Sequence, residues 1–291
     1  MFFFRKSIYT KYIKNNYNKE IAFLEGPITT LFSVKNKNVE KIAWIHNDIS
    51  LVFGNNLKSK LKKLFNKKIY EKYKKLIFVS NHNLEKFNNF YKINNEKLVI
   101  HNYIDKENII KLSNSFDVEI FDNNDINFVS VCRLVEQKAI DRLIDVHKKL
   151  IDSGFIHKFY IVGDGPLKNK LVEKIKKYNI LDTFILLGQK DNPYPYMLNA
   201  DYFCLLSYYE GLPITLLEAK VLNKYILITN TASQEALENY KNKKIFENNE
   251  KDIYNGLKNI IQNHNNLKMN NESLTDENEE IINKIENLLG E

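Results

Sequence analysis

Apolar, strand-like runs alternate with helical periodicity along most of this chain, and this alternation constrains the fold more than any other feature of the sequence. Continuous apolar runs of this kind indicate strands that are covered on both faces. The expected strands cover residues 41–46, 75–80, 97–102, 126–132, 159–163, 184–188, 202–207 and 225–229. The expected helices cover residues 56–73, 81–90, 138–153, 166–178, 213–222 and 250–262. Strands that alternate with helices predict an α/β fold with parallel sheets.

The alternation weakens at one place, which we take as a domain boundary. Residues 105–125 are rich in Asn, Ser and Asp and have weak periodicity, and the strand-helix pattern restarts beyond them. We therefore expect an N-terminal domain at residues 1–115 and a C-terminal domain at residues 116–265. Residues 266–291 are expected to form a linker and a final amphipathic helix.

Composition narrows the class of protein. The 291 residues suffice for two domains, and 44% hydrophobic residues is ordinary for a globular chain. The net charge of +7 is spread along the chain and favours anionic partners, but the lysines lack the aromatic interleaving typical of nucleic-acid binding. Cys132 and Cys204 lie in apolar runs, and the sequence has no cleavage signal and no run of 18 apolar residues. We expect a reduced cytoplasmic protein without a membrane span.

Charged residues follow two of the expected strands. Arg133 and Lys138 follow the strand at 126–132, whereas Glu210 follows the strand at 202–207 and Glu218 lies on the next helix. Open α/β sheets bind ligands at the carboxyl ends of their strands, where a guanidinium beside a second cation suits a diphosphate. Carboxylates accept the paired hydroxyl hydrogen bonds that sugar and ribose rings offer. Taken alone, Arg133 and Lys138 are equally compatible with ordinary surface charges, and Arg142 is expected on a solvated helix face.

Glycines accompany these charges at the ends of strands. Gly163 and Gly165 allow a tight turn, but Lys168 stands where a dinucleotide fingerprint requires a third Gly, so a plain strand-to-helix turn explains them equally well. Gly211 permits close approach of the backbone to a ligand. Pro213 can begin a helix whose free amides face an anion.

The ordered motifs CRLVEQKAID, VGDGPL, LLGQKDNPYPYML and SYYEGLPITLLEA resemble the donor domain of glycosyltransferase family 4 over residues 125–262. Members of that family have the GT-B fold, with two facing Rossmann-like domains. The resemblance implies that Arg133 and Lys138 bind the donor diphosphate, and that Glu210 faces the sugar and Glu218 the ribose. The other donor contacts that it implies are Gly163, Gly188, Gln189, Gly211 and Leu212, with Gly188 and Gln189 at the base.

The resemblance has departures, and it is thinner in the N-terminal half. Cys132 and Ala139 stand where the family usually has Gly. His46, at the end of KIAWIH, matches a histidine near the donor sugar and β-phosphate, although a lone His at a strand end is more often structural. Ser80 is expected to cap a helix without a chemical role. The family normally begins with a strand and a Gly-rich loop that precede YNKEIAFLEGPITTLFS, so the N-terminal domain is expected to be incomplete.

The resemblance implies a retaining glycosyltransferase of the capsule type, which moves a sugar from a nucleotide diphosphate sugar to a glycan or lipid-linked acceptor in surface polysaccharide synthesis. No cofactor and no metal ion are expected, because no aspartate pair follows a strand in the donor half and Arg133, Lys138 and helix amides can balance the leaving-group charge. The alternatives are a GT-B nucleotide-sugar epimerase and a non-catalytic nucleotide-sugar-binding subunit.

Residues 56–73 predict a basic amphipathic helix. Leu61, Leu64 and Phe65 fall near one helical face, and lysines occupy much of the remaining circumference. Such a stripe can pack on the helix's own sheet, or it can bind an anionic membrane. We expect peripheral contact with an anionic membrane, at the inner face of the plasma membrane, because the expected acceptor is lipid-linked.

Overall fold

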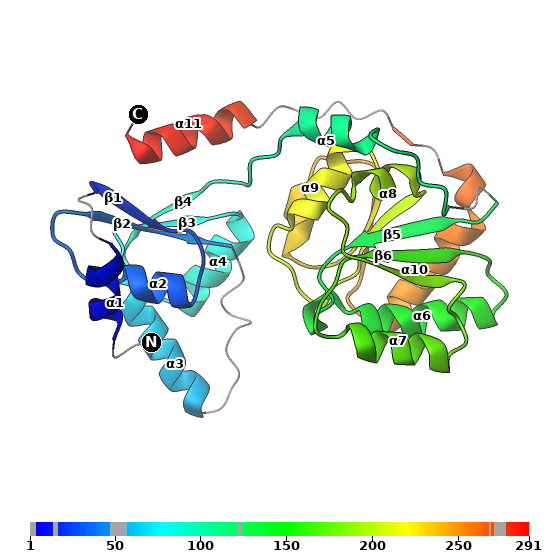
Figure 1. Ribbon diagram of the computed structural model, residues 1–291, viewed down its shortest axis with the longest axis horizontal. Coiled ribbons are helices and arrows are strands. Elements are labelled where there is room, and N and C mark those ends of the chain that lie inside the picture. Colours follow the sequence, from blue (N-terminus) through cyan, green and yellow to red (C-terminus); the bar gives the residue numbers. More distant parts are fainter. Residues whose placement is uncertain are drawn as a thin grey trace. The chain divides into compact units, whose positions relative to one another are not determined.

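The computed structural model describes residues 4–13, 17–46, 57–121, 124–267, 269–270 and 278–290. The chain divides into two compact units, one formed by Met1–Tyr103 with Asp276–Glu291 and the other by Ile104–Thr275. Each unit contains one parallel sheet with helices around it, which confirms the predicted α/β class (Figure 1).

The first unit has a four-stranded parallel sheet in the order β1-β2-β3-β4. Its strands are β1 (Lys19–Ala22), β2 (Glu40–Ile45), β3 (Lys75–Phe78) and β4 (Glu96–Val99). Its helices are α1 (Arg5–Tyr12), α2 (Pro27–Phe32), α3 (Leu57–Tyr70), α4 (Asn81–Phe90) and α11 (Asn278–Leu289). In Figure 1, α11 lies on the opposite side of the sheet from α1, α2 and α3. The Ser80 hydroxyl accepts a hydrogen bond from Asn83 N at 3.1 Å, which confirms the predicted cap of α4.

The second unit has a six-stranded parallel sheet in the order β10-β9-β8-β5-β6-β7. Its strands are β5 (Asn127–Val131), β6 (Lys158–Val162), β7 (Phe184–Gly188), β8 (Tyr202–Leu205), β9 (Tyr225–Thr229) and β10 (Lys243–Phe246). Its α-helices are α5 (Lys106–Ser113), α6 (Ile140–Asp152), α7 (Lys168–Lys177), α8 (Tyr194–Asn199), α9 (Ile214–Val221) and α10 (Glu250–Gln262). Helices α6, α7 and α10 cover one face of the sheet, and α5, α8 and α9 cover the other (Figure 1). The order of the strands along the chain reverses between β8 and β5, so these two strands form the switch point of the sheet.

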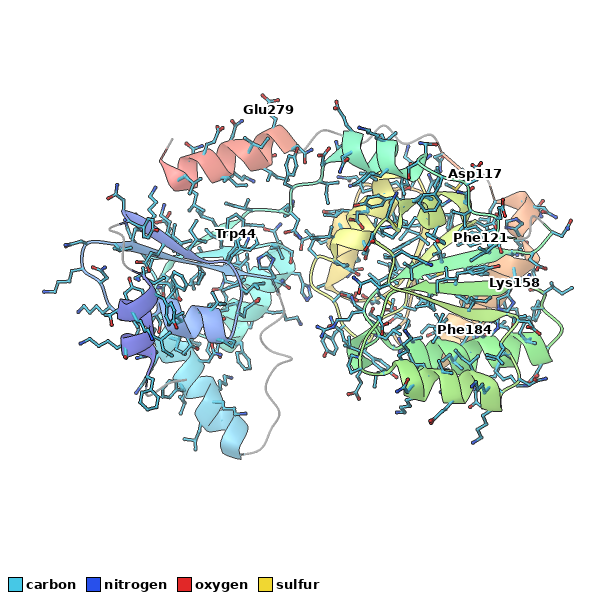
Figure 2. All side chains as sticks on the ribbon, viewed as in Figure 1. Trp44, Asp117, Phe121, Lys158, Phe184 and Glu279 are labelled. Atoms are coloured by element: carbon cyan, nitrogen blue, oxygen red, sulfur yellow. The ribbon has the colours of Figure 1, made fainter. Side chains whose placement is uncertain are left out.

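Large side chains on adjacent strands build the core of the second unit. The rings of Phe159 and Phe184 stack with 5.8 Å between their centroids, and Phe128 stacks on Phe159 at 4.7 Å (Phe184 is labelled in Figure 2). Cys132 and Cys204 are free and buried, as the sequence predicts. No helix in the described part of the chain is long and apolar enough to cross a membrane.

The structure divides the chain differently from the expected boundaries. Helix α5 lies inside the segment expected to link the domains, and it packs on α8 and α9, so the second unit begins at Ile104. Helix α11 belongs to the first unit rather than to a separate tail. Two strands, β1 and β10, were not expected. Both are short edge strands with polar and charged residues among the apolar ones, which is the usual character of sheet edges.

Candidate functional site

Three of the expected site residues lie at the switch point of the second unit. Arg133 and Lys138 follow β5, and Glu210 follows β8, the strand that pairs with β5. Ligands of open α/β sheets bind in the crevice outside the carboxyl ends of the strands at such a point. The topology therefore brings residues from distant parts of the sequence to one edge of one sheet.

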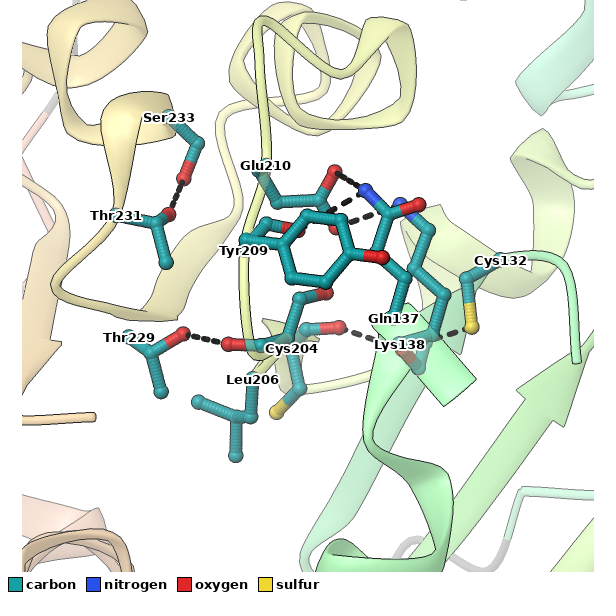
Figure 3. Close-up of polar contacts among 12 residues, drawn as sticks. Cys132, Gln137, Lys138, Cys204, Leu206, Tyr209, Glu210, Thr229, Thr231 and Ser233 are labelled. Atoms are coloured by element: carbon teal, nitrogen blue, oxygen red, sulfur yellow. Dashed lines mark hydrogen bonds and ion pairs between the residues drawn. The ribbon is translucent and has the colours of Figure 1, made fainter. Parts of the chain in front are cut away.

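Lys138 and Glu210 contact each other directly. The Lys138 Nζ lies 2.6 Å from Glu210 Oε1, and the side chains are only 15% and 4% exposed (Figure 3). Gln137 Nε2 donates to the Tyr209 carbonyl at 3.0 Å and to Glu210 Oε2 at 3.5 Å. A shielded ion pair offsets its desolvation only when further hydrogen bonds are made to its charged groups, and Gln137 supplies one to the Glu210 carboxylate. These contacts fix the segment after β5 to the loop after β8.

The Arg133 side chain is available to a ligand. It is exposed, and its guanidinium forms no hydrogen bond or ion pair within the ranges that the structure describes. A guanidinium presents a planar fork of donors that matches phosphate oxygens. The site thus combines one cation that is held by a carboxylate with one that is free to meet an anion.

Gly163 and Gly165 let the loop after β6 pass against the segment after β5. A Cβ atom at Gly163 would lie 1.9 Å from the Cys132 carbonyl oxygen, and one at Gly165 would lie 2.5 Å from the Leu134 carbonyl oxygen. Leu134 N donates to the Asp164 carbonyl at 2.9 Å across the same contact. Both glycines are therefore required by the close packing of two strand-end loops.

The two positions that depart from the family's Gly pattern are both buried. Ala139 has φ 51° and is fully buried, so it adopts the left-handed conformation that Gly takes most easily. That conformation costs a residue with a Cβ atom about 1–2 kcal/mol. Burial raises the pKa of the Cys132 thiol to about 11, which makes this side chain a packing element rather than a nucleophile.

The loop after β7 lies beside the loop after β6. Gly188 has φ 72°, and its carbonyl accepts a hydrogen bond from Gly163 N at 2.8 Å. Gln189 follows it and is exposed. The two residues expected at the base of the nucleotide are thus on the same sheet edge as Arg133 and Lys138.

Helix α9 begins close to Glu210 in the sequence and carries Glu218. Gly211 and Leu212 connect the loop to Pro213, which precedes the first residue of α9. Glu218 is half-buried, and burial raises its pKa although a hydrogen bond from Tyr194 opposes the shift. The Tyr194 hydroxyl donates to Glu218 Oε1 at 2.9 Å. Burial, with the neighbouring Glu218 charge, raises the pKa of Tyr194 to about 12. Neither Tyr194 nor Gln137 carries a spacing signal that identifies its role from sequence.

The expectation that Arg142 lies on a solvated helix face is wrong. Arg142 is only 8% exposed; its Nη2 donates to the Leu206 carbonyl at 2.7 Å and its Nη1 to Asn248 Oδ1 at 2.9 Å. Its guanidinium also lies 4.4 Å from the Tyr208 ring centroid. Arg142 therefore holds the start of the loop that carries Glu210. The sequence hint was its retention as Arg, because one Lys cannot replace this fork of donors.

His46 belongs to the first unit and is described within it. It follows β2, its N–H donates to Glu25 Oε1, and its carbonyl accepts from Asn83 Nδ2 at 3.3 Å. Burial lowers the pKa of His46, and the Glu25 carboxylate opposes this shift. The role of His46 toward a donor sugar stays a prediction of the resemblance. Within the described ranges, no group of three or more His, Cys, Asp or Glu side chains is arranged to hold a metal ion.

Curated proteins similar to this chain include glycosyltransferases. The "Uncharacterized glycosyltransferase MJ1059" of Methanocaldococcus jannaschii is 31% identical over 208 residues, which are 70% of this chain and 51% of that protein. A Campylobacter jejuni protein named N-acetylgalactosamine-N,N'-diacetylbacillosaminyl-diphospho-undecaprenol 4-alpha-N-acetylgalactosaminyltransferase is 30% identical over 180 residues, 62% of this chain and 47% of that protein. The chain spans about half the length of these two relatives.

Solved structures with a similar fold include Anabaena HepE in complex with UDP and glucose, with a TM-score of 0.70 and 14% identity over 90% of this chain and 72% of that chain. The pneumococcal O-GlcNAc transferase GtfA in complex with UDP and GlcNAc has a TM-score of 0.69 and 16% identity over 99% of this chain and 59% of that chain. At such identities the likeness establishes the fold class, which is GT-B, with two Rossmann-like units. Residues 111–275, more than half of the sequence, match the family model described as Glycosyl transferases group 1, and the chain therefore belongs to that family.

Proposed function

We propose that the second unit binds a nucleotide diphosphate sugar at its switch point, and that the protein transfers the sugar as a retaining glycosyltransferase of family 4. The observation that carries this proposal is the Lys138–Glu210 pair next to the exposed Arg133 at the carboxyl ends of β5 and β8. The UDP-containing structures of similar fold support it.

The charges at the site assign roles for catalysis. Arg133 and Lys138 bind the diphosphate, whose negative charge grows as its bond to the anomeric carbon breaks, and fixed cations aimed at that charge lower the barrier. A diphosphate that attracts Lys138 frees the Glu210 carboxylate to accept hydrogen bonds from the sugar hydroxyls. Glu218, which Tyr194 holds in place, binds the ribose.

Retention follows from attack on the face that the diphosphate leaves. The acceptor oxygen bonds to the anomeric carbon as the bond to the phosphate oxygen breaks, and the departing phosphate takes the acceptor proton. This route needs neither a cofactor nor a dedicated base, and the cations with the first amides of α9 meet the leaving-group charge. We therefore propose a metal-independent reaction.

The acceptor is a glycan or a lipid-linked sugar in surface polysaccharide synthesis. Relatives that support this class include the Campylobacter jejuni protein, whose name contains diphospho-undecaprenol, and the Erwinia amylovora amylovoran biosynthesis glycosyltransferase AmsD, which is 36% identical over 107 residues. We propose that the protein acts on such an acceptor in the cytoplasm, at the inner face of the plasma membrane.

Nucleotide binding tests the first half of the proposal. The melting temperature of the full chain is measured with UDP, GDP and ADP. A nucleotide that binds, at a concentration of about 100 times its dissociation constant, should raise the free energy of unfolding by about 2.7 kcal/mol. Arg133→Ala should weaken binding about tenfold or more, because it removes charge-assisted hydrogen bonds. Lys170→Ala on α7, also an exposed cation of this unit, is the control. No shift with any nucleotide at millimolar concentration contradicts the donor site.

Sugar transfer tests the second half. Glu210→Gln keeps the size of the side chain but removes its charge, and we expect turnover with a suitable nucleotide sugar to fall about 10² to 10³-fold. Chemical denaturation of the same variant shows how much of this loss comes from unfolding. Nucleotide binding without transfer of any sugar in a donor panel identifies a binding subunit instead of an enzyme.

A further inference from the structure

Helix α3 exposes its apolar stripe. Ile69 and Tyr70, at the C-terminal end of the helix, are buried in the core of the first unit. Leu61 and Leu64 are 64% and 60% exposed, and Phe65 is 47% exposed. At 3.6 residues per turn, Leu64, Leu61 and Phe65 span about 100° of the circumference, roughly opposite Tyr70. Leu61 and Leu64 therefore lie on the side of the helix away from the buried Tyr70, and packing on the helix's own sheet does not account for them.

Lysines border this stripe. Helix α3 contains no acidic residue, and Lys60, Lys62 and Lys68 are exposed. Two further lysines are committed to contacts, since Lys63 Nζ lies 3.6 Å from the Phe90 ring centroid and Lys67 Nζ lies 3.7 Å from Glu71 Oε1. The outer face of α3, defined as Leu61, Leu64 and Phe65 with Lys60, Lys62 and Lys68, thus combines apolar and cationic groups.

A second basic helix of the protein has a different distribution. Helix α7 also carries exposed lysines, but its Leu171 and Ile175 are buried in the second unit. The apolar residues of this basic helix are therefore buried, unlike the leucines of α3. The exposure at α3 calls for an occupant that takes up apolar side chains and anchors cations at the same time.

We propose that the outer face of α3 is a docking surface for an anionic lipid bilayer. Leucine and phenylalanine side chains of an interfacial helix enter the boundary between headgroups and acyl chains, while flanking lysines reach the phosphates. The charge complementarity selects anionic over neutral lipid. In Figure 1 the lower end of α3 extends beyond α1 and α2. The surface lies in the first unit and does not depend on the proposed sugar transfer.

Vesicle sedimentation with the full chain tests the docking surface without nucleotide or sugar. We expect binding to vesicles of phosphatidylcholine mixed with phosphatidylglycerol, little binding to phosphatidylcholine alone, and weaker binding as salt rises. Replacing Lys60, Lys62 and Lys68 together by Gln should weaken binding by up to roughly a hundredfold, at about fivefold for each lysine near the surface. The matched control replaces Lys170, Lys176 and Lys177 of α7 by Gln, which changes the net charge equally, and should have little effect.

The leucines separate insertion from attraction by charge alone. Leu61→Ser with Leu64→Ser should weaken vesicle binding by at least about tenfold. Because both side chains are exposed, the melting temperature should stay near that of the original protein, which shows that the variant folds. Equal binding to both vesicle types, equal effects of the two lysine triples, or unchanged binding of the serine variant each overturns the proposal. The last result indicates a surface that reads charge only, as an RNA-binding surface does.

Discussion

Lowering the pH from about 7 to about 5.5 is expected to destabilise the second unit through two buried histidines. His147 of α6 and His157, which precedes β6, are 0% and 1% exposed. The His147 Nδ1 lies 2.9 Å from His157 Nε2, and the His147 Nε2 lies 2.9 Å from the Thr183 hydroxyl. The His157 Nδ1 lies 3.0 Å from the Phe155 carbonyl oxygen. The four groups form a continuous hydrogen-bonded chain inside the protein.

The Phe155 carbonyl, at one end of this series of hydrogen bonds, determines the tautomers of both histidines. The Phe155 carbonyl can only accept, so His157 Nδ1 is the donor and His157 Nε2 is an acceptor in the neutral ring. His147 Nδ1 then donates to His157, and His147 Nε2, which carries no proton in this tautomer, faces the Thr183 hydroxyl at 2.9 Å, while the same hydroxyl lies 3.4 Å from the Ile180 carbonyl oxygen. A further proton on His157 would place two donors against each other at His147 Nδ1, and a further proton on His147 would put an unpaired positive charge in the buried core. Burial, helped for His147 by the His157 ring, lowers the pKa of His147 to about 2, and burial lowers that of His157 to about 4.

The size of the effect follows from these lowered pKa values. In the unfolded chain both histidines titrate near pH 6.5, so the unfolded state takes up protons first as the pH falls. The stabilisation that the two neutral histidines contribute is complete well above pH 6.5. It is lost progressively as the pH falls toward the pKa values of the folded state. Between about pH 7 and about pH 5.5 each histidine contributes a loss of about 1.2 kcal/mol, or about 2.5 kcal/mol for the pair. This is a large share of a typical folding free energy of about 5–15 kcal/mol.

Urea unfolding at the two pH values measures the loss. Circular dichroism follows both units, and the fluorescence of Trp44, the only tryptophan of the chain, identifies the transition of the first unit. The control is the variant His147→Gln with His157→Gln, which lacks both titrating rings but keeps all other ionisable groups. The variant is expected to be less stable at pH 7, and the stability gap between the two proteins should shrink by about 2.5 kcal/mol at pH 5.5. A stability gap of the same size at both pH values would refute the conclusion that both histidines are neutral in the folded protein.

Two substitutions probe the loops at the proposed site. Arg142→Lys should lower the unfolding free energy of the second unit by about 2 kcal/mol, because the Leu206 carbonyl and Asn248 cannot both keep a charge-assisted bond. The same substitution should weaken UDP binding. Calorimetry that gives an unchanged Kd would show that Arg142 does not position the Glu210 loop. Gly163→Ala should lower the free energy of unfolding by more than about 3 kcal/mol, since its Cβ would lie 1.9 Å from a backbone oxygen. Gly188 also has positive φ, but no atom lies within 4 Å of an added Cβ, so Gly188→Ala should lower the free energy of unfolding by only about 1–2 kcal/mol. Equal losses of stability in urea unfolding would contradict the close contact of the two loops.

The sequence by itself determines the sheet layers and the edge on which the site lies. Continuous apolar runs such as those around Phe128 and Phe203 form central strands, because only a strand covered on both faces tolerates such runs. The carboxyl ends of parallel strands meet at one edge, so the positions of Arg133, Lys138 and Glu210 after two strands predict that they share this edge. The direct Lys138–Glu210 contact needs the strand order of the sheet, in which β8 neighbours β5, and the sequence pattern does not specify that order.

Only the tertiary structure decides what covers each helix face. Periodicity predicts a stripe, but partners far away in the sequence determine whether the stripe is buried. Arg142 is buried because Leu206 and Asn248 converge on it, and α5 joins the second unit because α8 and α9 lie beside it. In α3, by contrast, Leu61 and Leu64 remain largely exposed. Burial depends on contacts between distant segments. A local sequence pattern shows which side chains can be buried, but not which of them find a partner.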